Sequence, residues 1–192
     1  MKKEIFYPKK GTPQYKFLLA PKAEREKTLK CWKKLNNWVI KPLYRVGLLP
    51  LLGVGALFLL LYTQGWKTGK RRITPVEYHK KNDGLIIFAS RGEKTHWLKN
   101  IKAKPEEVYV RIGFKKFKVK PQIIIDITER KRLLEWYIKK YPKAAKMLMG
   151  WDPKEDKIEE KDLTFIAENI VPVLLYKERK KKAGDIKEMK KG

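Results

Sequence analysis

Short apolar runs alternate with polar or glycine-containing segments along most of the chain. Residues 108–114 and 117–119 show strict alternation of apolar and polar side chains. This period of two predicts half-buried strands. Further apolar runs predict strands at residues 56–62, 73–79, 85–90, 123–127 and 170–176. Pro172 within the last run predicts a sheet edge or a bulge.

Turn residues separate these strands. Asn82, Asp83 and Gly84 form a strong hairpin signal. A succession of short strands with tight turns is typical of an antiparallel barrel or sandwich. The length of 192 residues fits one domain with terminal extensions.

A helix is predicted at residues 22–45. Glu24 and Glu26 lie in its first turn, where carboxylates favour the helix dipole, and Pro42 ends or kinks it. Apolar residues recur at steps of three or four and predict one packed face. They are Leu29, Trp32, Leu35, Trp38 and Val39. Shorter helices are predicted at residues 95–104, from Asp126 or Thr128 onwards, at 142–149 and at 163–169, with a charged loop at 150–161.

Residues 46–62 are uncharged and apolar. A membrane-spanning helix needs roughly 20 apolar residues, and this run is shorter and is interrupted by Pro50 and three glycines. A turn at residues 53–55 followed by a buried strand therefore fits better than a span. Shallow contact with a membrane remains open.

The charge is strongly positive, with 47 Lys and Arg against 21 Asp and Glu. This excess indicates an anionic partner: nucleic acid, an acidic membrane surface or a phosphorylated small molecule. Lysine-rich usage with one cysteine is also typical of a heat-adapted, thermophile protein. Charge alone therefore does not choose among these partners.

The pattern divides the chain into an irregular basic arm at 1–21, a single domain at 22–176 and a basic solvated tail at 177–192. Within the domain, a helix at 22–45 precedes a barrel at 54–176. Residues 1–15 lack the apolar core of a signal peptide, so a cytoplasmic location is expected. Cys31, His79 and His96 are too few for a disulfide or a typical metal centre.

Two strand ends carry candidate binding chemistry. Gly65 and Gly69 bracket Trp66, Lys67 and Thr68, and three further cations follow at once. Glycines let main-chain N–H groups converge on one spot, and cations bind anions strongly, so this loop is a candidate anion cradle. An ordinary hairpin with solvated lysines is the alternative.

Ser90, Arg91 and Gly92 repeat this theme at a second strand end, so both loops can face one ligand. No G-x-S-x-G motif or catalytic triad is evident, and we assign no catalytic residue. Cationic strand ends beside aromatic residues fit a protein whose chemistry comes from a bound cofactor. The residues expected to hold its anionic tail are Lys67, Arg71, Arg72 and Arg91. Trp97, Tyr78 and Phe88 form either a wall for a planar ring or ordinary core packing.

Five segments together resemble the deazaflavin-dependent nitroreductase and quinone reductase family. They are GWKTGKRRITPVEY, LIIFASRG, HWLKNIKAKPEEV, YPK and IVPVLLY, within a similarity covering about residues 35–176. The resemblance implies an α+β fold: a split β-barrel of about six mostly antiparallel strands with an N-terminal helix and flanking helices. It relates the chain to flavin-binding proteins of the pyridoxamine-phosphate-oxidase type.

The resemblance also implies coenzyme F420 as cofactor, with its phosphate on the first loop and its deazaflavin against the barrel. Hydride transfer to a quinone-like or nitroaromatic acceptor is the implied reaction. The implied cofactor-binding residues are Trp66, Lys67, Thr68, Gly69, Arg72, Ile73, Thr74, Pro75, Ala89, Ser90, Arg91, Trp97 and Asn100.

Three positions depart from the family pattern. Trp66 stands where arginine is usual, Glu77 where an aromatic residue is common, and Ala144 where a tyrosine often lies near the substrate. A flavin mononucleotide (FMN) or haem binder on the same barrel stays open. A membrane-attached form that reaches a lipid-soluble quinone also stays open, and so does a homodimer. A nucleic-acid-binding barrel that uses Lys116, Lys118 and Lys120 ranks last, since no motif supports it.

Overall fold

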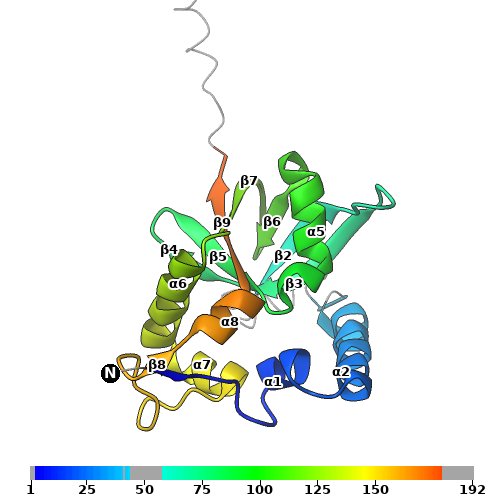
Figure 1. Ribbon diagram of the computed structural model, residues 1–192. Helices are drawn as coiled ribbons and strands as arrows, with labels where there is room; N and C mark the ends of the chain where they lie inside the picture. Colours follow the sequence, from blue (N-terminus) through cyan, green and yellow to red (C-terminus); the bar gives the residue numbers. More distant parts are fainter. Residues whose placement is uncertain (1–2, 41, 44–57, 179–192) are drawn as a thin grey trace, which may run out of the picture.

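The computed structural model describes residues 3–40, 42–43 and 58–178. Seven antiparallel strands form one curled sheet in the order β3-β2-β6-β7-β9-β5-β4 (Figure 1). Their bounds are β2 Phe58–Gln64, β3 Arg71–Glu77, β4 His79–Lys81, β5 Gly84–Ala89, β6 Tyr109–Ile112, β7 Lys115–Ile123 and β9 Val171–Lys177. The predicted α+β class is confirmed, with seven strands in this sheet where about six were expected.

Helices surround the lower part and one side of the sheet in Figure 1. They are α1 Pro13–Leu18, α2 Lys22–Leu35, α5 His96–Ala103, α6 Ile127–Lys140, α7 Pro142–Met149 and α8 Thr164–Asn169. Short turns are η1 Asn36–Ile40 (π-helical), η3 Gly92–Lys94 and η4 Pro105–Glu107. Two short strands, β1 Glu4–Ile5 and β8 Lys161–Asp162, pair in parallel.

One apolar core lies between the sheet and α5. Leu59, Leu61, Ile87 and Val173 from the strands pack with Leu98 from the helix. A second cluster joins α6, α7 and α8 to the N-terminal segment, where the Phe6 ring lies 4.9 Å from the ring of buried Trp151. The chemistry of the protein is expected where these two clusters meet.

The last strand is found as predicted, but its place in the sheet differs from the prediction. β9 lies inside the sheet between β7 and β5, and its pairing with β5 is unbroken from Val171 to Tyr176, so neither the sheet edge nor the bulge predicted from Pro172 is found. Pro172 pairs with Phe88 of β5, and its carbonyl accepts from Ile124 N, just beyond the end of β7. Because N–H and C=O of one strand residue point the same way, the missing proline donor faces a place where the neighbouring strand has ended.

Two strand predictions extend further than the strands of the structure. Residues 124–127 form no strand, because β7 runs through Pro121 and ends at Ile123, and Ile125 is exposed. Gly113, with φ +56°, turns the chain before Phe114, so that strand ends at Ile112. The predicted cap is confirmed: the Asp126 side chain accepts from Glu129 N at 2.7 Å and begins α6.

The N-terminal segment is more ordered than its composition suggests. Residues expected to be irregular form β1 and α1, and the buried Gln14 side chain donates to Ser90 O at 2.9 Å. The expected helix continues only to Leu35 before η1, and no residue of α2 is buried. The packing role predicted for Trp38 is wrong, since its side chain is 81% exposed.

Residues 44–57 and 179–192 lie outside the described residues. They include most of the apolar run at 46–62 and most of the predicted tail at 177–192. Among the helices that are described, none combines the length and apolarity needed to cross a membrane.

Candidate functional site

The basic loop between β2 and β3 is a compact turn. Gly65 N donates to Lys70 O at 2.9 Å, and Gly69 N donates to Gly65 O at 2.8 Å. Gly69 has φ +63°, a conformation that favours glycine. Thr68 N and Lys70 N are also bonded within the loop. Most N–H groups of the loop are therefore bonded within the protein instead of pointing outwards, and we expect side chains to supply the main donors for an anion.

Asn100 holds this loop against α5. Its Oδ1 accepts from Trp66 N at 3.0 Å, and its Nδ2 donates to Thr63 Oγ1 at 2.9 Å. The side chain is buried, and both ends of its amide are used. Asn100 thus acts on the loop by positioning it.

Cations in and around the loop lie over the rings of Trp66 and Tyr62. Lys67 Nζ is 4.7 Å and Lys99 Nζ 5.5 Å from the centroid of Trp66. On the same hairpin, the Arg71 guanidinium lies 5.4 Å from the centroid of Tyr62. Such cation–π contacts keep the charges at the surface, where they attract an anionic ligand.

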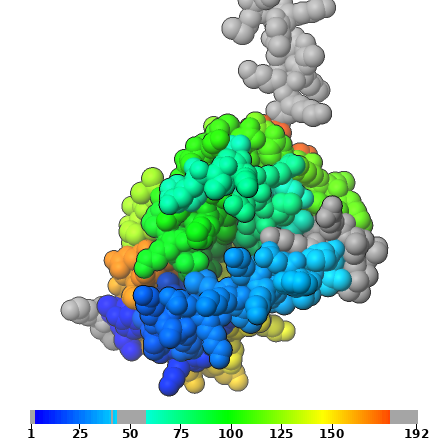
Figure 2. All heavy atoms as spheres, turned by 90° about the vertical axis from the view of Figure 1, so that its right-hand side faces the viewer, coloured from blue at the N-terminus to red at the C-terminus, as the bar shows by residue number. Residues whose placement is uncertain are grey.

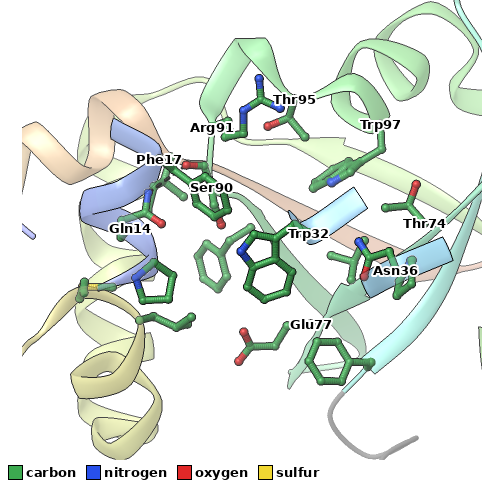
Figure 3. A pocket seen from close by; sticks show the side chains of 18 of the residues that line it. Gln14, Phe17, Trp32, Asn36, Thr74, Glu77, Ser90, Arg91, Thr95 and Trp97 are labelled. Carbon is green, nitrogen blue, oxygen red and sulfur yellow. Dashed lines mark hydrogen bonds between the residues drawn. The ribbon is translucent and has the colours of Figure 1, made fainter. Parts of the chain in front are cut away.

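A mostly apolar cavity of about 360 Å³ lies between the sheet and the helices. This volume falls in the range of small-molecule sites, about 300–1,000 Å³. Strands β3 and β5 form one wall, α1, α2 and η1 another, and α5, α6 and α7 complete it; Figure 3 shows the side chains. Phe88, Trp97 and Tyr137 provide aromatic rings in its lining.

The second cationic strand end forms part of this cavity. Ser90 and Arg91 both line it, and burial lowers the pKa of the Arg91 guanidinium from its ordinary value. Arginine nonetheless remains charged in proteins, so a partly desolvated cation lies at the border of the cavity. Gly92 has φ +48°, and a Cβ there would lie 2.9 Å from Asn169 O of α8. Only glycine allows the chain to pass so close to this helix.

The structure divides the predicted site residues into two groups. Five line the cavity: Thr74, Pro75, Ser90, Arg91 and Trp97. The others do not: Trp66, Lys67, Thr68 and Gly69 lie in the first loop, Arg72 and Ile73 at the start of β3, Ala89 in the core, and Asn100 under the loop. Helix α5 links the groups, because Trp97 lines the cavity while Lys99 and Asn100 contact Trp66.

Of the predicted aromatic wall, Phe88 and Trp97 line the cavity, whereas Tyr78 packs in the core. Sequence reasoning missed the contribution of the N-terminal segment. Gln14, Phe17, Trp32 and Asn36 close one side of the cavity, as Figure 3 shows. The available signal is Trp32, which aligns with Leu29 and Leu35 and is predicted to pack, yet is half-exposed.

Two residues of the lining, Thr95 and Tyr137, have a buried hydroxyl that lacks a hydrogen-bond partner within the described part of the chain. Buried polar groups are normally satisfied, so these two hydroxyls beside one cavity are candidate partners for a ligand with polar edges. A ligand with a planar ring, polar ring edges and an anionic tail fits this cavity. The ring matches the aromatic walls, the polar edges match the two hydroxyls, and the tail matches Arg91. No cluster of metal-ligating side chains occurs among the residues described.

The sequence profile of the F420H(2)-dependent quinone reductase family matches residues 48–153. A protein named F420H(2)-dependent quinone reductase from Mycobacterium tuberculosis (strain H37Rv) is 39% identical over 64 residues. That alignment spans 32% of this chain and 42% of the relative, so less than half of the relative's length is matched.

Solved structures also superpose on parts of the chain. An F420-H2 dependent reductase (FDR-A) is 26% identical with a TM-score of 0.39, covering 63% of this chain and 93% of that one. HutZ, the heme storage protein from Vibrio cholerae, is 9% identical with a TM-score of 0.43, covering 68% and 90%. These TM-scores describe partial superposition only.

Proposed function

The chain belongs to the F420H(2)-dependent quinone reductase family, and we propose that it is a deazaflavin-dependent oxidoreductase that reduces a quinone-like or nitroaromatic acceptor. The observation that carries the proposal is the aromatic cavity beside Arg91, joined through α5 to the basic first loop. The reduced coenzyme F420 supplies the hydride when bound. The protein's own part is to bind, orient and shield the reactants.

Each part of the site has a distinct task in this proposal. Phe88 and Trp97 take the planar ring, and Thr95 Oγ1 bonds one of its polar edges. Arg91 and the cations of the first loop, Lys67 and Arg72, bind the anionic tail. Asn100 keeps that loop in place. Thr74, Pro75 and Ser90 line the cavity, while Ala89 and Ile73 act as supports.

Fluorescence titration of the purified protein with oxidised coenzyme F420 tests the proposal, with FMN and haem each titrated for comparison. The Arg91→Met variant removes the cation in the cavity, and Arg132→Met removes an exposed arginine of α6 as a matched control. Saturable binding that weakens in Arg91→Met alone supports the site. A folded protein that binds FMN in preference, or haem, establishes the alternative cofactor, and one that binds none of the three rules out the oxidoreductase proposal.

A lipid-soluble quinone would require peripheral membrane contact, and one exposed surface supports it. Leu35, Trp38 and Val39 are exposed at the end of α2 and in η1, beside Lys33 and Lys34. In Figure 2 the α1–α2 segment (blue to light blue) forms the lower part of the face shown. Apolar side chains flanked by lysines suit the surface of an anionic bilayer.

Vesicle flotation tests this contact with phosphatidylcholine alone and with added phosphatidylglycerol. Binding to the anionic vesicles, lost in Trp38→Ser but kept in a Trp66→Ser control, supports it. Self-association in sedimentation velocity that the same Trp38→Ser change abolishes would assign the surface to a homodimer instead. Binding to a nucleic acid of any sequence with no vesicle binding would favour the basic-barrel alternative.

A further inference from the structure

The cavity contains a carboxylate in an otherwise mostly apolar lining. Glu77 is the last residue of β3, its side chain is 31% exposed, and it lies on the side of the cavity opposite Arg91 and Thr95 in Figure 3. A half-buried carboxylate costs free energy unless it is paired or used. Within the β2–β3 hairpin it pairs with Phe58, at the end opposite the basic loop that joins Gln64 to Arg71.

A histidine lies directly behind this carboxylate. His79 Nε2 is 3.1 Å from Glu77 Oε1, and the His79 side chain is almost fully buried. The imidazole ring lies 4.1 Å from the Tyr141 ring and edge-on to Tyr137 at 5.1 Å. Imidazole is the side chain best suited to gain and lose a proton near neutral pH. The pair therefore resembles a proton source with one end in the cavity.

Tyr137 completes the group from α6. Tyr137 lines the cavity, and its buried hydroxyl has no partner within the described residues. Burial first, then the negative charge of Glu77 and the neighbouring Tyr141, raise the pKa of the Tyr137 hydroxyl above its ordinary value. Tyr137 therefore keeps its proton and serves as a hydrogen-bond donor, not as the acid.

We propose that Glu77 and His79 deliver the proton that quinone reduction consumes, while the Tyr137 hydroxyl holds the acceptor oxygen. This inference rests on the oxidoreductase function proposed above. Reduced coenzyme F420, when bound, would supply the hydride, and its two-electron oxidation would balance the reduction of the quinone. An O–H bond forms on the quinone oxygen as the Glu77 carboxyl group passes it a proton, and the N–H bond of the His79 imidazolium breaks as that proton is replaced on Glu77, so the charge of the Glu77 carboxylate is unchanged. The quinone leaves as the hydroquinone, and the His79 imidazole takes up a proton from water.

Two acceptors with different proton demands test the proposal. Menadione needs a hydride and a proton, whereas the N-methylacridinium cation needs only the hydride. In single turnovers with the reduced coenzyme, Glu77→Gln should slow menadione reduction about 100-fold, as expected for the loss of a general acid. Reduction of N-methylacridinium should stay within about twofold of wild type, since no proton is transferred. The exposed Glu106→Gln is the matched control.

Each outcome is informative. Equal slowing with both acceptors would show that Glu77 only shapes the cavity, and no slowing with menadione would overturn the proton role. A wild-type protein that reduces neither acceptor would instead overturn the oxidoreductase function itself.

NMR of the imidazole nitrogens provides a readout that needs no cofactor. The chain has two histidines, so a His96→Asn background leaves one imidazole, that of His79. The ring-nitrogen signals should change when Glu77→Gln is added and remain unchanged with Glu106→Gln. Identical signals in the presence and absence of the Glu77 carboxylate would show that the two side chains share no proton.

Discussion

The two cationic strand ends look alike in sequence but differ in structure. The loop after β2 is exposed, and five of its backbone N–H groups, those of residues 65, 66, 68, 69 and 70, are bonded within the loop or to Asn100. The loop after β5 is half-buried: Arg91 lines the cavity, Gln14 bonds Ser90 O, and Gly92 passes close to α8.

This difference indicates that burial, and not residue type, determines whether a cation attracts an anionic ligand from a distance or binds it directly. Exposed cations act through a field that salt screens, whereas a partly desolvated guanidinium makes strong, directional bonds. The first loop is therefore expected to attract the anionic tail, and the second to fix the ligand in place. The following experiments compare the two loops directly.

Glycine-to-alanine changes should separate the loops most strongly. Gly92→Ala combines a left-handed conformation with a Cβ 2.9 Å from Asn169 O, and should cost about 3 kcal/mol of unfolding free energy. Gly69→Ala has a left-handed conformation but open space around its Cβ, and should cost about 1 kcal/mol. Urea denaturation measures both, and equal losses would mean that the approach to α8 carries no constraint.

Removing one cation from each loop comes next. Arg91→Met should weaken coenzyme F420 binding about 10- to 100-fold, as expected for a charge-assisted bond in a partly buried site. Lys67→Met should weaken coenzyme binding only about threefold, and at high salt this variant should bind as tightly as wild type. Titrations at low and high salt decide the matter; a larger effect at Lys67 would reverse the roles of the loops.

Asn100→Ala tests the support of the first loop. The change removes two hydrogen bonds and leaves Thr63 Oγ1 and Trp66 N without their partner. The free energy of unfolding should therefore fall by about 2 kcal/mol. Hydrogen exchange should show faster opening of the loop while the cavity stays protected. Uniform loss of protection across the sheet would instead place Asn100 in the global core.

Helix α8 packs against Gly92 of the second loop, and its contribution to the stability of the protein should fall at low pH. Lys131 and the N-terminus of α8 at Thr164 hydrogen-bond the Asp162 carboxylate and lower its pKa to about 2. A carboxylate whose pKa is lowered in the folded protein stabilises it at pH values above the ordinary pKa. This stabilisation is lost as the pH falls from about 4 to about 2. Because the pair is partly exposed, Asp162→Asn should cost only about 1 kcal/mol near neutral pH.

The acid measurement compares the unfolding free energies of wild type and Asp162→Asn over this pH range. The difference between them should shrink towards zero as the carboxylate is protonated. A difference that stays constant down to about pH 2 would assign the effect to shape instead of charge.

Local patterns were sufficient for much of this molecule. Alternation at residues 108–112, the turn at Asn82 (φ 49°) and the Asp126 cap depend on neighbours in sequence, and the structure confirms them. The resemblance to the family was likewise readable from short motifs, and the profile match at residues 48–153 confirms it. The division into domains and the individual cofactor-binding residues stay predictions.

Long-range packing decided the rest. Pro172 lies in a central strand because β7 ends beside it, and no local pattern contains that information. Gln14 reaches Ser90 across 76 positions of sequence, and this contact lets α1 form a wall of the cavity. Lone residues such as Glu77 and Tyr137 acquire a meaning only beside each other.

The sequence by itself determined the elements that short-range hydrogen bonding and side-chain periodicity control: most strands, the helix starts and the two glycine-flanked cationic turns. Only the tertiary structure decided which of those turns faces a cavity, and that the N-terminal segment encloses it. The physical reason is burial: exposure, desolvation and orphaned hydroxyls arise where distant segments meet, and they set what a charge or a polar group can do.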